Sequence, residues 1–175
     1  MKRLHVLTLI GLLAYSTNGY SEVQENRPCV IESKNYPEHF ITSKDYVCAI
    51  EMVENQEKLR HCKFKTVPGL ADSKCVSIES ADFPGYFLRH QDYLIKLHKN
   101  DGSEQFKQDA TFKKQKGLAD PEYVSFESFN FPEHYIRHKC LILWINKQDN
   151  SDLFKMDATF KMDDPNKAIP PKFSK

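Results

Sequence analysis

The sequence has few of the features that mark a membrane protein or a nucleic-acid-binding protein. Only 6 of its 175 residues are glycine and 1 is tryptophan, and 25 basic side chains nearly balance 24 acidic ones, which gives a formal net charge of +1. A net charge near zero argues against a basic field that attracts nucleic acid. After residue 21 no run of about 18 apolar residues occurs, so we expect no later segment to span a membrane.

Sequence patterns of common catalytic and metal sites are also missing. The chain lacks a Gly-Xaa-Ser-Xaa-Gly elbow, a His-Glu-Xaa-Xaa-His motif, a phosphate-binding loop and a Cys-Xaa-Xaa-Cys pair. The spacing of its cysteines and histidines matches no common zinc pattern. The sequence therefore predicts no enzyme activity, no metal site and no cofactor.

Residues 1–21 are typical of a secretory signal peptide. A basic start precedes an apolar run over residues 4–14, and Gly19 and Ser21 are small residues suited to a cleavage site. The run is too short to cross a bilayer. We expect a secreted, extracellular chain whose folded domain covers residues 22–163 and is followed by a polar tail at 164–175.

An internal repeat determines the expected architecture. Residues 76–112 and 124–160 align without a gap at an offset of 48, with 17 identities over 37 positions. A third, more divergent copy aligns at an offset of 47 in its first half and 48 in its second half. The repeats cover about 29–72, 76–120 and 124–163, and Gly-Leu-Ala-Asp stretches mark the two joints between them.

Within each copy the pattern is that of short strands. Apolar and polar residues alternate, for example at Tyr93, Ile95 and Leu97, and helical periodicity is absent. A turn at 100–102 predicts a hairpin whose second strand lies within 105–112. Three units of about four strands each favour a closed all-β body, because an open array would leave its ends unprotected. The predicted fold class is all-β, a β-trefoil of three repeats of about 48 residues.

Two motifs recur at matched spacing in the second and third copies. Phe-Pro followed by Arg-His occurs at residues 83–90 and 131–138, and Asp-Ala-Thr-Phe occurs at 109–112 and 157–160. These strings resemble the repeat of the arabinofuranose-binding domain of α-L-arabinofuranosidases, carbohydrate-binding module family 42. The resemblance covers nearly the whole mature chain. It implies a non-catalytic β-trefoil with shallow pockets, at most one per copy, that bind L-arabinofuranosyl side chains.

The resemblance also assigns candidate sugar-binding residues, which are His90 with Asp109 and His138 with Asp157. A carboxylate accepts hydrogen bonds from sugar hydroxyls, and an imidazole both donates and accepts, so the two groups complement a furanose. Phe87 and Tyr135 are expected to add an apolar wall, for which Tyr86 and Phe131 are alternatives. Arg89 and Arg137 are expected to hold a carboxylate such as Glu79 or Glu127.

The first copy departs from both motifs. Thr42 and Ser43 replace Arg-His, and His61-Cys62-Lys63-Phe64 replaces Asp-Ala-Thr-Phe. We therefore expect this copy to be structural and the chain to have two functional pockets at most.

Five cysteines suit a secreted chain, in which disulfides persist. Four cysteines allow three pairings. The repeat alignment places Cys48 and Cys62 at core positions and Cys29 and Cys75 at the starts of equivalent strands, which favours the pairs Cys48–Cys62 and Cys29–Cys75. Cys140 remains, either as a buried free thiol or as a handle for an intermolecular bridge to a partner.

The sequence thus predicts a secreted, lectin-like protein whose partner is a glycan of the arabinofuranosyl type or another furanose or pyranose. The alternative is an extracellular structural or matrix protein that uses the trefoil as a scaffold and Cys140, its charged loops and its tail for assembly.

Overall fold

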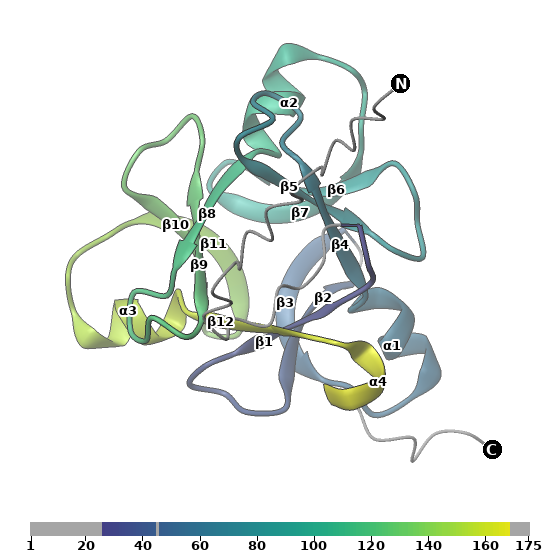
Figure 1. Cartoon of the computed structure of the whole chain (residues 1–175), viewed down its shortest axis with the longest axis vertical. Helices are drawn as coiled ribbons and strands as arrows, with labels where there is room; N and C mark the ends of the chain where they lie inside the picture. Colours follow the sequence, from purple (N-terminus) through teal and green to yellow (C-terminus); the bar gives the residue numbers. More distant parts are fainter. Residues whose placement is uncertain (1–25, 45, 169–175) are drawn as a thin grey trace, which may run out of the picture.

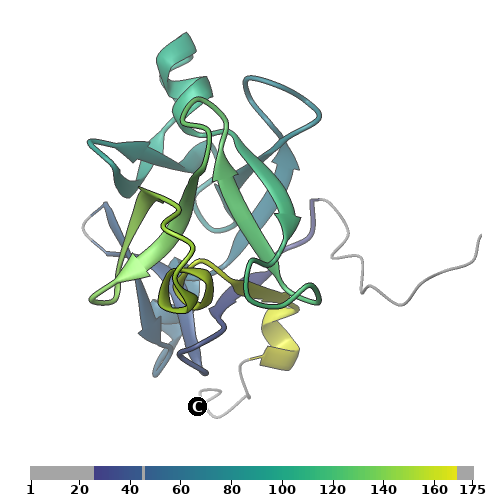
Figure 2. The same cartoon turned by 90° about the vertical axis from the view of Figure 1, so that its left-hand side faces the viewer.

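The computed structural model describes residues 26–44 and 46–168. The predicted signal peptide and the last residues of the predicted tail lie outside this part of the chain. The fold is all-β, with the described strands joined in one sheet. Viewed down the shortest axis, the chain forms three lobes around a common centre (Figure 1), and the side view shows strands running steeply through a barrel-like body (Figure 2).

The strands form two kinds of antiparallel pair. Three hairpins are made by β2 (His39–Lys44) with β3 (Val47–Met52), β6 (Tyr86–Gln91) with β7 (Leu94–Lys99), and β10 (His134–Lys139) with β11 (Ile142–Lys147). The remaining strands are β1 (Val30–Ser33), β4 (Phe64–Pro68), β5 (Val76–Ser80), β8 (Phe112–Lys116), β9 (Val124–Ser128) and β12 (Phe160–Asp163). These pair as β4 with β5, β8 with β9, and β12 with β1.

The pairing of β12 with β1 joins the two ends of the fold. Four consecutive residue pairs, from Val30–Asp163 to Ser33–Phe160, lie opposite each other. The hairpins also contact one another, because the backbone oxygen at each hairpin turn accepts a bond from the next hairpin. Tyr46 accepts from Leu97, and Tyr93 accepts from Ile145. Residues far apart in the sequence are therefore held side by side.

Short helices are the feature that the sequence analysis missed. They are α1 (Gln56–His61), α2 (Glu104–Asp109), α3 (Asp152–Asp157) and α4 (Pro165–Ala168). The strand predicted within 105–112 is wrong for its first part, since α2 occupies it and β8 begins only at Phe112. The Ser103 side chain accepts a hydrogen bond from the Phe106 N–H and caps α2. None of the described helices is long and apolar enough to cross a membrane.

The core has a central cluster and three outer ones. The central cluster gathers buried residues of the strands, among them Ile31, Ile78 and Phe126. Each outer cluster places a helix or its end against a hairpin strand: Phe40 with Cys62, Phe87 with Phe106, and Tyr135 with Phe154. Helices α1, α2 and α3 are thus each packed against a hairpin through a small apolar cluster.

The Gly-Leu-Ala-Asp joints are held by the threonines of the Asp-Ala-Thr-Phe motif. The Thr111 hydroxyl donates to the Lys107 carbonyl at 2.7 Å and accepts from the Ala71 N–H at 3.0 Å. Thr159 does the same with Lys155 and Ala119. Gly117 leaves no room for a side chain, because an added Cβ would lie 2.5 Å from the Asp120 carbonyl oxygen and 2.8 Å from Thr159 Cγ2.

Neither predicted disulfide is formed. All five cysteines are free thiols, so the pairs Cys48–Cys62 and Cys29–Cys75 are corrected. Cys48 and Cys62 are both fully buried, as the alignment predicted, but Cys48 belongs to the central cluster and Cys62 to the outer cluster beside α1. Cys29 is buried, whereas Cys75 is only half-buried. Cys140 is exposed rather than buried.

Candidate functional site

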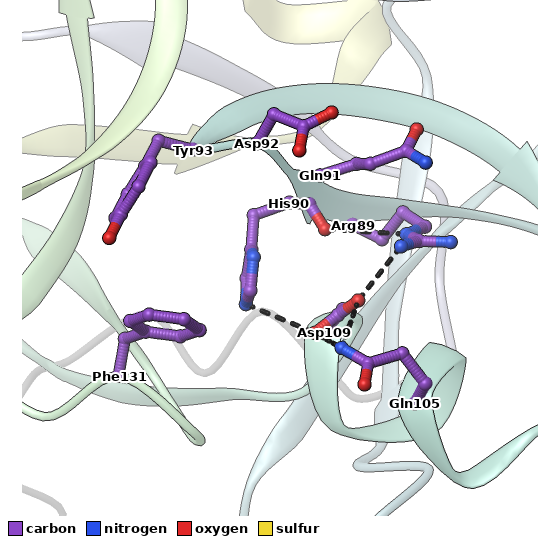
Figure 3. Close-up of a pocket in the computed structure, with 8 residues that line it drawn as sticks. All are labelled: Arg89, His90, Gln91, Asp92, Tyr93, Gln105, Asp109 and Phe131. Atoms are coloured by element: carbon purple, nitrogen blue, oxygen red, sulfur yellow. Dashed lines mark hydrogen bonds and ion pairs between the residues drawn. The ribbon is translucent and has the colours of Figure 1, made fainter.

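A cavity of about 370 Å³ opens beside the carboxylate of Asp109. Strand β6 and the turn after it supply most of its lining, helix α2 supplies its floor, and Phe131 closes one side from the loop after β9 (Figure 3). We call this cavity the Asp109 pocket. Its lining residues are Arg89, His90, Gln91, Asp92, Tyr93, Gln105, Asp109 and Phe131.

The Asp109 carboxylate is buried and lies at the centre of a hydrogen-bond network. Arg89 Nη2 donates to Oδ2 at 2.8 Å, and Asn130 Nδ2 donates to Oδ1 at 2.8 Å. Gln105 Nε2 lies 3.0 Å from Oδ1 and 3.1 Å from Oδ2. A buried charge needs such partners. The arginine therefore holds the carboxylate of the motif itself, and not Glu79, whose carboxylate accepts from the Gly85 N–H instead.

His90 is buried next to this carboxylate. Its Nε2 lies 2.8 Å from Asn130 Oδ1 and 3.5 Å from Asp109 Oδ1. Because the Asn130 amide donates to Asp109, its oxygen accepts, and the network assigns the proton to Nε2 of the imidazole. Burial lowers the pKa of His90 below its usual value. The ring is therefore neutral at neutral pH, and its Nδ1 is an acceptor.

The same arrangement of side chains recurs around Asp157, and we call this site the Asp157 pocket because it is equivalent to the Asp109 pocket in the repeat alignment. Arg137 Nη2 donates to Asp157 Oδ2 at 2.8 Å, and His138 Nε2 lies 3.5 Å from Oδ1. The amide comes from Asn35, whose Nδ2 donates to Asp157 Oδ1 at 2.7 Å and whose Oδ1 lies 2.8 Å from His138 Nε2. Burial lowers the pKa of His138 as well. The arginine, asparagine and histidine contacts of the two networks match, whereas the contact of Gln105 with Asp109 has no counterpart among the described residues at Asp157.

An aromatic ring stands against each histidine. The Phe131 ring lies edge-on to His90 at 5.1 Å, and the Tyr36 ring lies edge-on to His138 at the same 5.1 Å. Tyr93 extends the aromatic wall of the Asp109 pocket, at 5.7 Å from Phe131 (Figure 3). Each site thus combines a carboxylate, a neutral imidazole, an arginine and an apolar wall, a combination suited to a small polyhydroxylated ligand.

Comparison with known proteins identifies the family. The family model described as the alpha-L-arabinofuranosidase B (ABFB) domain matches residues 29–162. The chain belongs to this family. A curated relative of this ABFB domain is the extracellular exo-alpha-(1->5)-L-arabinofuranosidase of Streptomyces avermitilis, which is 51% identical over 85 residues, covering 49% of the chain and 17% of the relative.

Solved structures agree with this assignment. A GH54 α-L-arabinofuranosidase soaked with 4-nitrophenyl α-L-arabinofuranoside has a TM-score of 0.72 and 27% identity, covering 80% of this chain and 31% of that one. An arabinofuranosidase complexed with arabinofuranosyl-alpha-1,2-xylobiose has a TM-score of 0.71 and 28% identity. A structure described as the BEL β-trefoil is similar in fold, with a TM-score of 0.61 and 12% identity. The ABFB domain spans less than a third of both arabinofuranosidase chains.

The structure places the four candidate binding residues of this ABFB domain in two separate sites. His90 lies with Asp109, and His138 lies with Asp157. Phe87 and Tyr135 require correction, because they are only 6% and 8% exposed and pack under α2 and α3. Phe87 shares its strand face with Arg89, which points toward the helix, whereas His90 lies on the other face.

Sequence reasoning missed the asparagines. Asn130 and Asn35 bridge histidine to carboxylate, yet each comes from a different copy than the other two groups: Asn130 from the next copy, and Asn35 from the first copy. Ser128 and Ser33 hydroxyls hold the asparagine oxygens, both at 3.0 Å. The available signal was the alignment of Asn35 with Asn130, together with the aromatic residue that follows each of them.

The equivalent position in the first copy has different chemistry. Thr42 is 2% exposed and its hydroxyl has no hydrogen-bond partner among the described residues. His61 occupies the place of Asp109, and Asp82 occupies the place of Asn130. Asp82 pairs with Lys63, whose Nζ lies 2.9 Å from Oδ2. The arginine, histidine and asparagine arrangement of the other two sites is absent from this position.

Proposed function

We propose that the chain is a secreted, non-catalytic carbohydrate-binding domain that folds as a β-trefoil of three repeats. Two of these repeats form pockets for terminal L-arabinofuranosyl groups. The observation that carries the proposal is the recurrence of one network of arginine, histidine, carboxylate and asparagine at two sites, each beside an aromatic ring. Symmetry alone would repeat scaffold residues, but the network around Asp109 also borders an open cavity, where its unused acceptor positions can meet a ligand.

The hydrogen-bonding positions that the network leaves unused match the hydroxyls of a furanose. A carboxylate has about four lone-pair positions. Asp157 uses two of them for Arg137 and Asn35, so positions remain for sugar hydroxyls. The neutral imidazole offers a second acceptor at Nδ1. Arg89 uses Nε and Nη2 for its own contacts and has N–H groups left to donate to a sugar oxygen.

Binding rather than hydrolysis is favoured by the distribution of carboxylates. A glycosidase needs two carboxyl groups that flank one bond. Asp109 and Asp157 belong to different pockets. The Asp109 pocket also has Asp92 in its lining, but Cys140 replaces it at the equivalent position of the Asp157 pocket. One carboxylate position therefore recurs in both sites, and a pair of carboxylates does not.

Isothermal titration calorimetry of the mature chain with an arabinofuranosyl oligosaccharide tests the proposal. We expect two sites per monomer, one site in His90→Ala and one in His138→Ala, and none in the double variant. Ser43→Ala is the matched control, because Ser43 takes the place of the histidine in the first copy. It should keep both sites. A folded wild-type chain that gives no heat, or a double variant that still binds, would refute the proposal.

A further inference from the structure

The two pockets share their floor but differ at the rim. In the Asp109 pocket the rim carries Tyr93 from the hairpin turn and Gln105 from α2. At the equivalent positions of the Asp157 pocket the residues are Leu141 and Leu153. Tyr93 and Leu141 have the same turn conformation, with φ of 64° and 67°. The exchange therefore changes the side chain and not the backbone that presents it.

Both leucines are exposed. Leu141 is 40% exposed and Leu153 is 66% exposed. An exposed leucine is common, but two on the rim of one polar site form a local apolar surface that a ligand can cover. Leu153 lies one helical turn before Asp157, as Gln105 lies before Asp109, so it stands next to the carboxylate. Gln105 instead donates to that carboxylate and offers a polar amide to whatever lies at the rim.

In the proposed binding mode, the rim contacts whatever is attached to the sugar. The carboxylate and imidazole at the floor need the ring hydroxyls, so the anomeric oxygen and its substituent must leave through the mouth of the pocket. A substituent at that place meets Tyr93 and Gln105 in one pocket and the two leucines in the other.

We propose that the Asp157 pocket selects arabinofuranosides whose anomeric substituent is apolar, whereas the Asp109 pocket selects those whose substituent is another sugar. This inference rests on the proposed function, since it concerns the same two sites. Leu141 and Leu153 are the specificity-determining residues. Tyr93 supplies an aromatic surface for a second sugar ring, and Gln105 and Asp92 supply polar contacts.

The experiment compares methyl and hexyl α-L-arabinofuranoside at each pocket separately. In His90→Ala only the Asp157 pocket should still bind, and in His138→Ala only the Asp109 pocket. Where a histidine variant fails to fold, Asn130→Ala replaces His90→Ala and Asn35→Ala replaces His138→Ala. The readout is the ratio of the two dissociation constants. We expect the hexyl glycoside to bind about tenfold more tightly than the methyl glycoside at the Asp157 pocket, from leucine surface removed from water. At the Asp109 pocket the ratio should stay within about threefold.

Rim variants test the residues themselves. Leu141→Asn with Leu153→Ser, made in the His90→Ala chain, should lower the ratio to that of the Asp109 pocket. Asn is chosen because it tolerates a positive φ. The matched control is Tyr46→Asn with Glu57→Ser at the equivalent positions of the first copy, which should leave the ratio unchanged.

The possible failures are distinguishable. Binding of the methyl glycoside at both pockets with equal hexyl-to-methyl ratios would overturn this inference and leave the proposed function standing. A ratio that survives the leucine substitutions would overturn the role of the rim. A folded chain that binds neither glycoside at either pocket would overturn both proposals.

Discussion

The two buried ion pairs offer a test in which the same substitution, made at two equivalent positions, should lower the free energy of unfolding by different amounts. Arg89→Thr and Arg137→Thr each leave a carboxylate without its guanidinium. The ion-pair distances are both 2.8 Å, and both arginine side chains are 12% exposed. Each guanidinium also lies over a phenylalanine, Phe106 at 5.3 Å and Phe154 at 5.1 Å. The lost packing is therefore nearly equal, and a comparison of the two variants cancels it.

What remains around the two carboxylates differs. Asp109 keeps the amides of Gln105 and Asn130, whereas among the described side chains only the Asn35 amide still donates to Asp157 within 3 Å. Removing one partner of a buried pair costs about 3 to 5 kcal/mol. A hydrogen bond to a charged group contributes about 1.5 to 3 kcal/mol. We expect Arg137→Thr to cost about 4 kcal/mol and Arg89→Thr about 2 kcal/mol of unfolding free energy.

Urea unfolding at neutral pH measures both values. Threonine is a suitable replacement because Thr42 occupies the equivalent place in the first copy. Gln105→Leu supplies the control, since it converts Asp109 to the surroundings of Asp157. In that background Arg89→Thr should become as costly as Arg137→Thr. Equal costs for the two single variants, or a larger cost for Arg89→Thr, would refute the reasoning.

Two further predictions concern titration and thiols. Burial lowers the pKa of His90 and His138 in the folded chain, so on acidification the unfolded chain binds protons at these residues before the folded chain does. The contribution of the two neutral histidines to the free energy of unfolding should therefore be fully present above the ordinary pKa of 6.5 and should decrease as the pH falls below it. Thermal unfolding across this range checks it, with His90→Gln/His138→Gln as the flatter comparison; a wild-type curve independent of pH would contradict it. In native alkylation Cys140 should react first, whereas Cys48 and Cys62 should react only after unfolding, because burial raises the pKa of both thiols, that of Cys62 to about 12. Failure of these two to react in the denatured, unreduced chain would indicate that they are bonded.

The repeat alignment carried much of the sequence prediction because it needs no knowledge of the fold. Equivalent residues sit in equivalent places, so the match of His90 with His138 and of Asp109 with Asp157 holds in space. Helices α1, α2 and α3 were missed because six residues are too few for a 3.6-residue period to appear. Their signals are local instead, such as the serine caps at Ser103 and Ser151.

Contacts between copies could not be read in the same way. Each copy was compared with the others as a unit, whereas each pocket is built from two different copies. Asn130 is 21 residues from Asp109, and Asn35 is 122 residues from Asp157. The prediction that Phe87 and Tyr135 form the apolar wall was wrong for a related reason. Closeness in sequence to a histidine does not place a side chain on the same face of a strand.

The Asp157 pocket shows what joining the ends of the fold makes possible. Its asparagine and its aromatic ring come from residues 35 and 36, near the start of the described chain, and its carboxylate comes from α3 near the end. They meet because β12 pairs with β1. Joining distant segments adds little free-energy cost, since loop-closure entropy grows only with the logarithm of length. The two pockets can therefore have the same floor although one bridges neighbouring segments and the other bridges the ends. At their rims the backbone contacts of Tyr93 and Leu141 are also equivalent, and only the side chains differ.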